Sequence, residues 1–432
     1  MTHAPSFKVT RFSAALLLIV QAGHTCAGVG PYNFDEVTAL AQGSLVGINV
    51  ADPVPGFELR LLYRGRVVYS RAFGNWAIGR VANADSSTKT VSGAVIVSVI
   101  ATSSNLPRPF TLATKLSDYI PAFDGAKRNI TIQQAFSHTA GFSGFTTAES
   151  DQSISLQQAS VQIAGEPLRY TPGSNFSYTG IGMHAAGAAA ELATGTSWNT
   201  LFAQRLAAPL GLTATRFVLT SPSNPRIAGG CESNAEEFSR FMETLRRGGV
   251  YDGLSGPVRV LSQSAVDMMF TRQSPAGLPI TFTPLTGVSD YGVGVWLDQR
   301  DAGGNLIGAL AGGARGFCCW IDFDDEMVGC ISTDLTRFSN IETLQYLIRA
   351  AAERAIRNPA CLADVTGAMP GPGPDGVVDG GDFTGFINSF AAGDVATDAT
   401  ADIVDGGGTP PGDGTIDGSD FIAFINAFAG GC

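Results

Sequence analysis

The sequence predicts an α+β protein in which an antiparallel sheet is flanked by helices and carries a helical insert, followed by a small C-terminal repeat module. Strand patterns occur on both sides of a mostly helical stretch at about residues 133–249, so we expect N- and C-terminal pieces to close one sheet. Residues 361–432 contain an internal repeat with a period of 38 residues. The chain of 432 residues is 44% hydrophobic, which is too apolar for a disordered protein.

The elements of the large domain follow from local patterns. A hairpin is expected at residues 58–63 and 67–70 around the turn Arg64-Gly65-Arg66. The apolar run at 88–101 has helical spacing and predicts a buried helix. The remaining elements are helices at 34–42 and 341–356 and strands at 291–296, 316–323 and 327–333.

The charge distribution excludes whole classes of function. The net charge is −11, and residues 361–432 hold eleven Asp without any Glu, Lys or Arg, so the rest of the chain is neutral. A neutral body without a basic excess does not suit nucleic acid. The chain has only four His, two of them before residue 25, which argues against a binuclear zinc hydrolase.

Residues 1–27 have the pattern of a bacterial export signal. Lys8 and Arg11 precede a short apolar run at 14–20, and small residues follow up to Ala27. A lipoprotein signal using Cys26 and an uncleaved anchor remain alternatives. No later segment is apolar enough to cross a membrane. We therefore expect the mature protein to be secreted, periplasmic or at the cell surface.

Six cysteines remain after such cleavage, and an even number in an exported protein suggests disulfides. Cys361 and Cys432 bracket the acidic tail. A hairpin centred on residues 323–326 would place Cys319 opposite Cys330, and Cys318 on the other face could reach Cys231. Six cysteines allow fifteen pairings, so this connectivity is one hypothesis among several.

The tail repeat resembles half of a calcium loop, because each unit reads Asp-Gly-x-(Val/Ile)-Asp-Gly-x-Asp before a helix with Phe on one face. Asp carboxylates are hard oxygen ligands, and the Gly allows the sharp turn. The sequence thus predicts an EF-hand-like module that binds Ca²⁺; an Asp/Gly-rich disordered tail is the alternative. The candidate ligands are Asp364, Asp375, Asp379, Asp382, Asp402, Asp413, Asp417 and Asp420.

On these motifs the tail, residues 361–432, resembles a dockerin-type module. The resemblance implies docking to a cohesin-like or cell-surface protein partner. Asp364 and Asp402 depart from the usual spacing, because each lies eleven residues before the next loop Asp instead of four. Their role as ligands is therefore less well supported by the pattern than that of the other six.

The chemistry of the body centres on Ser86 and Lys89, three residues apart at the start of the predicted helix 88–101. At this spacing both side chains face the same way, so the Lys amine can take the Ser proton, and the helix N-terminus favours the alkoxide. The alternative is a surface Ser and Lys at a helix start.

Further motifs follow in order: Phe136-Ser137-His138-Thr139-Ala140-Gly141, then Ser177-Tyr178-Thr179-Gly180, then Ala311-Gly312-Gly313-Ala314 before a strand. Their order resembles the β-lactamase-related serine hydrolases, which include class C β-lactamases, D-alanyl-D-alanine peptidases and related esterases. The resemblance covers most of the chain and implies a β-lactamase/transpeptidase-like domain at 31–358.

The resemblance implies a role for each matching residue. Ser86 is the expected nucleophile and Lys89 its proton acceptor, while Tyr178 shares the acid and base work, as a phenolate if Lys89 lies close enough to lower its pKa. The oxyanion hole would be formed by the backbone N–H groups of Ser86 and Ala314. Gly312 and Gly313 would line the substrate-binding site.

Two departures bear on the substrate. Gly180 replaces the Asn of the usual Tyr-x-Asn element, and Ala311 stands at the Lys position of the Lys-Thr-Gly-like element, with no Lys anywhere after residue 127. An uncharged small-molecule ester or amide is therefore favoured over a carboxylate-bearing β-lactam, although Arg315 could partly replace the charge.

The sequence thus favours an exported serine hydrolase, acting as an esterase, peptidase or β-lactamase-like enzyme without a catalytic cofactor. The alternative is a weak or inactive surface protein that binds through its tail. His138 is expected to hold a loop together, His184 to be packed or on the surface, and Trp296 and Trp320 to belong to the core.

Overall fold

The computed structural model describes residues 32–253, 256–285, 288–337, 341–357, 362–365, 378–395, 398–404, 410 and 412–430. The expected export signal at residues 1–27 lies outside these ranges, as do Asp375, Cys361 and Cys432. All statements about structure refer to the described residues.

One six-stranded antiparallel sheet forms the centre of the large domain, with strand order β10-β11-β12-β13-β1-β2. The first two strands of the chain pair with the last ones, so the two ends close one sheet as the sequence predicts. The strands are β1 (Gly56–Tyr63), β2 (Arg66–Gly74), β10 (Trp296–Arg300), β11 (Leu306–Gly312), β12 (Cys318–Asp322) and β13 (Met327–Ser332).

The sheet differs from the prediction in one region. Residues 291–295 do not form the expected strand; only Tyr291 makes an isolated bridge, and β10 begins at Trp296. Gly294 has a φ of +79°, and a Cβ there would lie 2.1 Å from the Lys89 carbonyl oxygen. The chain therefore bends here to approach the buried helix instead of running extended. Strand β11 was not predicted as a separate strand.

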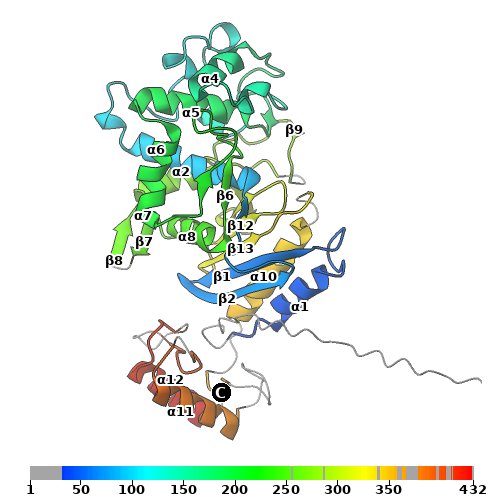
Figure 1. Cartoon of the computed structure of the whole chain (residues 1–432), viewed down its shortest axis with the longest axis vertical. Coiled ribbons are helices and arrows are strands. Elements are labelled where there is room, and N and C mark those ends of the chain that lie inside the picture. Colours follow the sequence, from blue (N-terminus) through cyan, green and yellow to red (C-terminus); the bar gives the residue numbers. More distant parts are fainter. Residues whose placement is uncertain are drawn as a thin grey trace, which may run out of the picture.

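Helices cover both faces of the sheet (Figure 1). The helices α1 (Asp35–Ser44) and α10 (Glu342–Arg357) pack together on one face, in a core that includes Cys318 and Trp320. The other face packs against α8 (Ala235–Arg246) and, beyond the sheet, α2 (Thr88–Ala101). The expected helix at 88–101 thus has the predicted bounds.

The insert between the two halves of the sheet is mainly helical and lies at one end of the domain (Figure 1). Besides α8, its helices are α3 (Ile132–Phe136), α4 (Leu156–Gly165), α5 (Ile181–Thr194), α6 (Trp198–Phe202), α7 (Ala208–Leu210) and α9 (Gln263–Phe270). Short strands complete it: β3 (Ala82–Asn83), β4 (Phe176–Ser177), β5 (Arg216–Phe217), β6 (Cys231–Ser233), β7 (Val250–Gly253), β8 (Gly256–Arg259) and β9 (Ile280–Phe282).

One disulfide prediction is confirmed and one is wrong. Cys319 pairs with Cys330 across β12 and β13 and is bonded to it. Cys318 and Cys231 are both free and buried. They cannot meet because Cys231 belongs to the same core as Cys319, while Cys318 points into the core on the opposite face of the sheet.

In the tail, helices α11 (Gly380–Ala392) and α12 (Gly418–Gly430) follow the two repeats. The ring of Phe386 stacks on that of Phe424 with centroids 3.9 Å apart, and both side chains are fully buried. The predicted Phe faces of the two helices therefore form a small apolar core.

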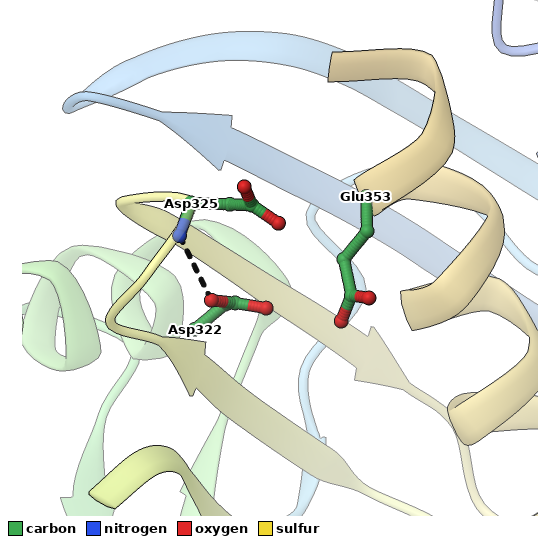
Figure 2. Close-up of side chains that lie close together, drawn as sticks. All are labelled: Asp322, Asp325 and Glu353. Atoms are coloured by element: carbon green, nitrogen blue, oxygen red, sulfur yellow. Dashed lines mark hydrogen bonds between the residues drawn. The ribbon is translucent and has the colours of Figure 1, made fainter. Parts of the chain in front are cut away.

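A buried charge network joins α10 to the sheet. Asp322, Asp325 and Glu353 bring their carboxylates together, as Figure 2 shows. Although three acids at this spacing could hold a cation, the Arg349 guanidinium, 1% exposed, already lies 3.6 Å from Asp322 and 3.4 Å from Glu353. Arg357 pairs with Asp325 at 2.8 Å. The cluster therefore has its own counter-charges.

Because Arg349 is buried among carboxylates, we expect Arg349→Ala to lower the free energy of unfolding by about 3–5 kcal/mol. The change leaves several acids buried without a cation. The measurement is denaturant unfolding. Arg354→Ala, which removes an ion pair to Glu36 exposed to solvent on both sides, is the matched control and should change stability little. Equal effects of the two variants would contradict the structural role.

Candidate active site

The site is built on the start of α2. A single turn at Asp85–Ser87 leads directly into the helix, so Ser86 and Lys89 lie on the same side. The Lys89 Nζ lies 2.9 Å from the Ser86 Oγ and donates a second hydrogen bond, 2.8 Å long, to the Ala228 carbonyl oxygen. The structure thus brings the predicted nucleophile and proton acceptor into direct contact.

Lys89 is only 4% exposed, and this burial sets its chemistry. Desolvation disfavours the charged ammonium and is the main reason that the pKa of Lys89 falls to about 7; the nearby Arg226 adds to the effect, while Glu149 and Asp85 oppose it. An amine with a pKa near neutrality can accept the Ser86 proton at physiological pH.

Tyr178 follows strand β4 and faces the same site. Its ring stacks on Trp296 with centroids 5.2 Å apart, and the Lys89 Nζ lies 4.6 Å from its centroid. Burial raises the pKa of the Tyr178 phenol, and its hydrogen bond with Ser86 only partly opposes this. The raised pKa runs against the expected phenolate and favours the protonated phenol, and the Lys89 amine lies over the face of the ring.

His138 and His184 are both structural. His138 Nδ1 accepts the Thr179 N–H at 3.3 Å, its carbonyl accepts the Ser177 N–H, and its ring lies 4.4 Å from that of Tyr178. His138 thus holds the loop that carries the tyrosine, as expected. His184 is fully buried and hydrogen-bonded to Asn224.

The sequence predicts that the backbone N–H groups of Ser86 and Ala314 form an oxyanion hole. Within the described residues, neither the Ser86 nor the Ala314 amide donates a hydrogen bond. Ala314 lies in the turn between β11 and β12, next to Gly313, where a Cβ would lie 2.4 Å from the Ala84 carbonyl oxygen. Gly313 therefore lets this turn approach the nucleophile closely.

Asp85 and Arg315 tie the two halves of this arrangement together. The Asp85 carboxylate accepts hydrogen bonds from the Arg315 backbone N–H at 3.1 Å and from its guanidinium at 3.0 and 2.9 Å. Asp85 precedes Ser86 and has a φ of +45°, an unfavourable backbone conformation for a residue with a side chain. The ion pair thus fixes the strained nucleophile turn against the turn of Ala314, and Arg315 does not supply the free charge suggested from the sequence.

A cavity of about 370 Å³ opens onto Ser86. Ser86, Lys89, Tyr178, Gly312, Gly313 and Ala314 all line it, so the structure brings the predicted body residues together. Ala311 is buried in β11 and does not line the cavity. Much of the remaining wall is apolar and comes from Phe145, Phe282, Pro284, Leu285 and Trp296.

Three lining residues were missed or misjudged from the sequence. Trp296 belongs to the core as predicted, at 3% exposure, but it also lines the cavity; Trp320 is core only. Glu149 and Arg226 come from the insert and also line the cavity, although neither lies in a recognisable motif. Only the placement of their segments beside α2 gives them a role.

In the second repeat, all four predicted calcium ligands lie within the described residues. The Asp402 carboxylate is fully buried; its Oδ2 accepts the Gly414 N–H, and its Oδ1 has no hydrogen-bond partner among the described residues. Burial and the neighbouring Asp420 and Asp413 raise the pKa of Asp402 to about 6. A buried carboxylate oxygen without a partner, crowded by other acids, fits a hard cation.

Asp420 ties the segment after Asp402 to the first turn of α12. Asp420 Oδ1 accepts the backbone N–H groups of Ile403 and Val404, which directly follow Asp402. In the first repeat, Asp382 accepts the N–H of Val365 beside Asp364 in the same way. Within the described part of the tail, no three carboxylates lie within 4.8 Å of one another.

The other two predicted ligands, Asp379 and Asp417, cap the tail helices. Asp379 Oδ1 accepts the Gly381 N–H, and Asp417 Oδ1 accepts the Ser419 N–H. These bonds satisfy backbone donors at the helix starts. Capping alone therefore accounts for an Asp at these two positions.

Residues 47–353 match the family model described as beta-lactamase. The chain belongs to the β-lactamase family. A comparison with curated protein sequences finds no match.

Solved structures of this family share the fold. A candidate β-lactamase from Bacteroides dorei DSM 17855 is 21% identical, with a TM-score of 0.64 over 76% of this chain and 100% of that one. A family VIII carboxylesterase is 17% identical, with a TM-score of 0.59 over 74% and 97%. A D-stereospecific amidohydrolase from Streptomyces is 18% identical, with a TM-score of 0.54 over 74% and 98%. The family fold therefore hosts esterase and amidase relatives.

Among the described residues, no helix combines the length and the hydropathy needed to cross a bilayer.

Because Arg315 holds the turn of Ala314 without lining the cavity, we expect Arg315→Met to lower kcat of ester hydrolysis about 100-fold with little change in KM. Steady-state kinetics on a p-nitrophenyl ester checks this. Arg337→Met, which removes an exposed ion pair to Asp52, is the control. A rise in KM at constant kcat would instead show that Arg315 acts by binding substrate.

Proposed function

We propose that the chain is an exported serine hydrolase that cleaves an ester or amide through an acyl-enzyme on Ser86. One observation carries the proposal: the Ser86 hydroxyl lies 2.9 Å from a buried amine of lowered pKa, at the edge of a cavity lined by Ala314, whose N–H is unused within the described residues. A surface Ser and Lys at a helix start would not be buried in this way.

In the proposed acylation step, Lys89 takes the Ser86 proton while the Oγ forms a bond to the substrate carbonyl carbon. The carbonyl oxygen gains negative charge and is stabilised by the N–H groups of Ser86 and Ala314. As the bond to the leaving oxygen or nitrogen breaks, Tyr178 donates its proton to that atom and regains one from the Lys89 ammonium.

Deacylation runs through the same groups. A water molecule loses a proton to Lys89 and attacks the acyl carbon, and the ester bond to Ser86 breaks. The Ser86 Oγ takes the proton back from Lys89, which returns the enzyme to its starting state. The burial of Lys89 supports this scheme because the same amine must gain and lose a proton twice in each cycle.

The cavity supports an apolar ester or amide as substrate. Its walls are largely aromatic and aliphatic, and the expected Lys of the Lys-Thr-Gly-like element is replaced by a buried Ala311. Arg315, the cation suggested from the sequence, is already bonded to Asp85. The carboxylesterase and amidohydrolase that share the fold fit the same range of reactions.

For the tail we propose Ca²⁺ binding and docking to a cohesin-like or surface protein. In the second repeat Asp402, Asp413 and Asp420 would hold the ion, with Asp417 beside them; in the first, Asp364, Asp375, Asp379 and Asp382 are the corresponding residues. A bound Ca²⁺ would neutralise the acidic loops and join each loop to its helix. Export through residues 1–27 would place both parts outside the cytoplasm.

If Ser86 is activated by Lys89, a fluorophosphonate probe should form one adduct, mapped to Ser86 and absent from Ser86→Ala. Because the pKa of Lys89 is lowered to about 7, the neutral amine is present above that pH. The labelling rate should therefore rise with pH through about 7 and then level off. Intact-mass analysis measures this rate. Lys89→Met should abolish the labelling, whereas Lys115→Met, an exposed control, should not. A flat pH profile would count against Lys89 as the base.

If the repeats bind Ca²⁺, adding it to the full-length protein should raise the melting temperature of the tail, and a chelator should reverse this, because the ion relieves repulsion between buried carboxylates. Differential scanning calorimetry follows the transition. Asp402→Asn should weaken the effect, and Asp394→Asn, outside the predicted ligand set, should not. Identical curves with Ca²⁺ and with chelator would contradict the proposal.

A further inference from the structure

The space at position 180 is already filled by another residue. A Cβ on Gly180 would lie 2.4 Å from the Glu149 Oε1 and 2.9 Å from the Ala228 Cβ. Contacts this short do not occur, so no side chain fits there while Glu149 stays in place. Gly180 is two residues after Tyr178, and both line the cavity. The absence of a side chain at 180 therefore leaves the room that the Glu149 carboxylate occupies.

Glu149 reaches this place from a different element. It ends the short turn Thr147–Glu149 of the insert and is 2% exposed, yet it lines the cavity. Its Oε2 accepts only a long bond, 3.4 Å, from the Thr146 N–H. Its Oε1 accepts no hydrogen bond from the described residues. An acceptor atom at the cavity wall is thus left for another partner.

Two cationic side chains face the Glu149 carboxyl. Burial raises the pKa of Glu149 above its usual value, and Arg226 and the charged form of Lys89 only partly offset this. The Arg226 guanidinium itself makes no hydrogen bond or ion pair within 4 Å among the described residues, so it acts on Glu149 through space. An ionised carboxylate only accepts hydrogen bonds, whereas an amide at position 180 would both donate and accept.

We propose that Glu149 is a substrate-positioning residue that takes the place of the missing side chain at 180 and selects acyl groups carrying a hydrogen-bond donor next to the scissile carbonyl. The inference rests on the proposed acyl-enzyme mechanism and names its substrate class: esters or amides whose acyl part bears an N–H or O–H beside apolar groups. A substrate that lacks the donor leaves the buried carboxylate without a hydrogen-bond partner. The free-energy cost of that unpaired group lowers the reactivity of such substrates and so makes the site selective.

Two esters of equal shape test this: p-nitrophenyl N-acetylglycinate, which has an N–H, and p-nitrophenyl levulinate, which has a CH₂ in its place. After correction for their rates of alkaline hydrolysis, kcat/KM for the wild type should favour the first about 10- to 100-fold, as expected for a hydrogen bond to a charged group. Glu149→Ala should lose this preference. Glu149→Gln keeps the shape and should retain a smaller one.

Position 180 provides the reciprocal experiment. Gly180→Ala should also reduce the preference, because its Cβ displaces Glu149. The double variant Glu149→Ala with Gly180→Asn has room for the amide and should regain part of it, a rescue that a merely structural role for Glu149 would not produce. Asp151→Asn, a nearby acid that does not line the cavity, is the control, and melting temperatures check that each variant is folded.

The outcomes separate the two proposals. If both esters acylate Ser86 and the preference is the same in the wild type, Glu149→Ala and the double variant, the role of Glu149 is overturned and the serine mechanism stands. If neither ester forms an acyl-enzyme on Ser86, detected by intact mass, the proposed function is overturned and the inference with it.

Discussion

The structure of the site depends on the burial of one amine at the start of an apolar helix. Of the fourteen residues of α2, only Ile100 and Ala101 escape burial, so Lys89 must enter the core with the rest of the helix. Close packing requires glycines on both sides: a Cβ on Gly93 would lie 2.1 Å from the Val293 carbonyl oxygen, and one on Gly294 equally close to that of Lys89. The same packing that stabilises the helix removes water from the amine, and this desolvation lowers the pKa of Lys89 to about 7.

Every other part of the site is brought to α2 by a different segment. The insert contributes Tyr178, held by His138, and the β11–β12 turn contributes Ala314. Because these segments are far apart in the chain, their relative positions rest on long-range contacts. The Asp85–Arg315 pair is the clearest of these, since it joins the turn before Ser86 to the turn of Ala314 through three hydrogen bonds. The pair therefore holds these two turns in place relative to each other.

The sequence predicted those features that depend on short-range pattern. The bounds of α2, the hairpin that pairs Cys319 with Cys330, and the Phe faces of the tail helices all follow from local periodicity. Errors arose where the outcome depends on distant packing. The predicted Cys231–Cys318 pairing was wrong because the alternation of side chains along a strand shows only that neighbouring residues point to opposite faces of the sheet. It does not show against which face a distant residue such as Cys231 packs. The strand expected at 291–296 begins late because Gly294 bends toward Lys89.

Glu149 shows most clearly why a site cannot be read from motifs alone. At Gly180 the sequence shows only that a side chain is missing, which by itself suggests a weakened site. The structure shows that the volume is filled by a carboxylate from a turn 31 residues earlier. Under our proposal, the Glu149 carboxylate stands where an amide would otherwise contact the substrate. A carboxylate only accepts hydrogen bonds, whereas an amide both donates and accepts them. The proposal thus places the selectivity in one polar group from a neighbouring element and leaves Ser86, Lys89 and Tyr178 unchanged.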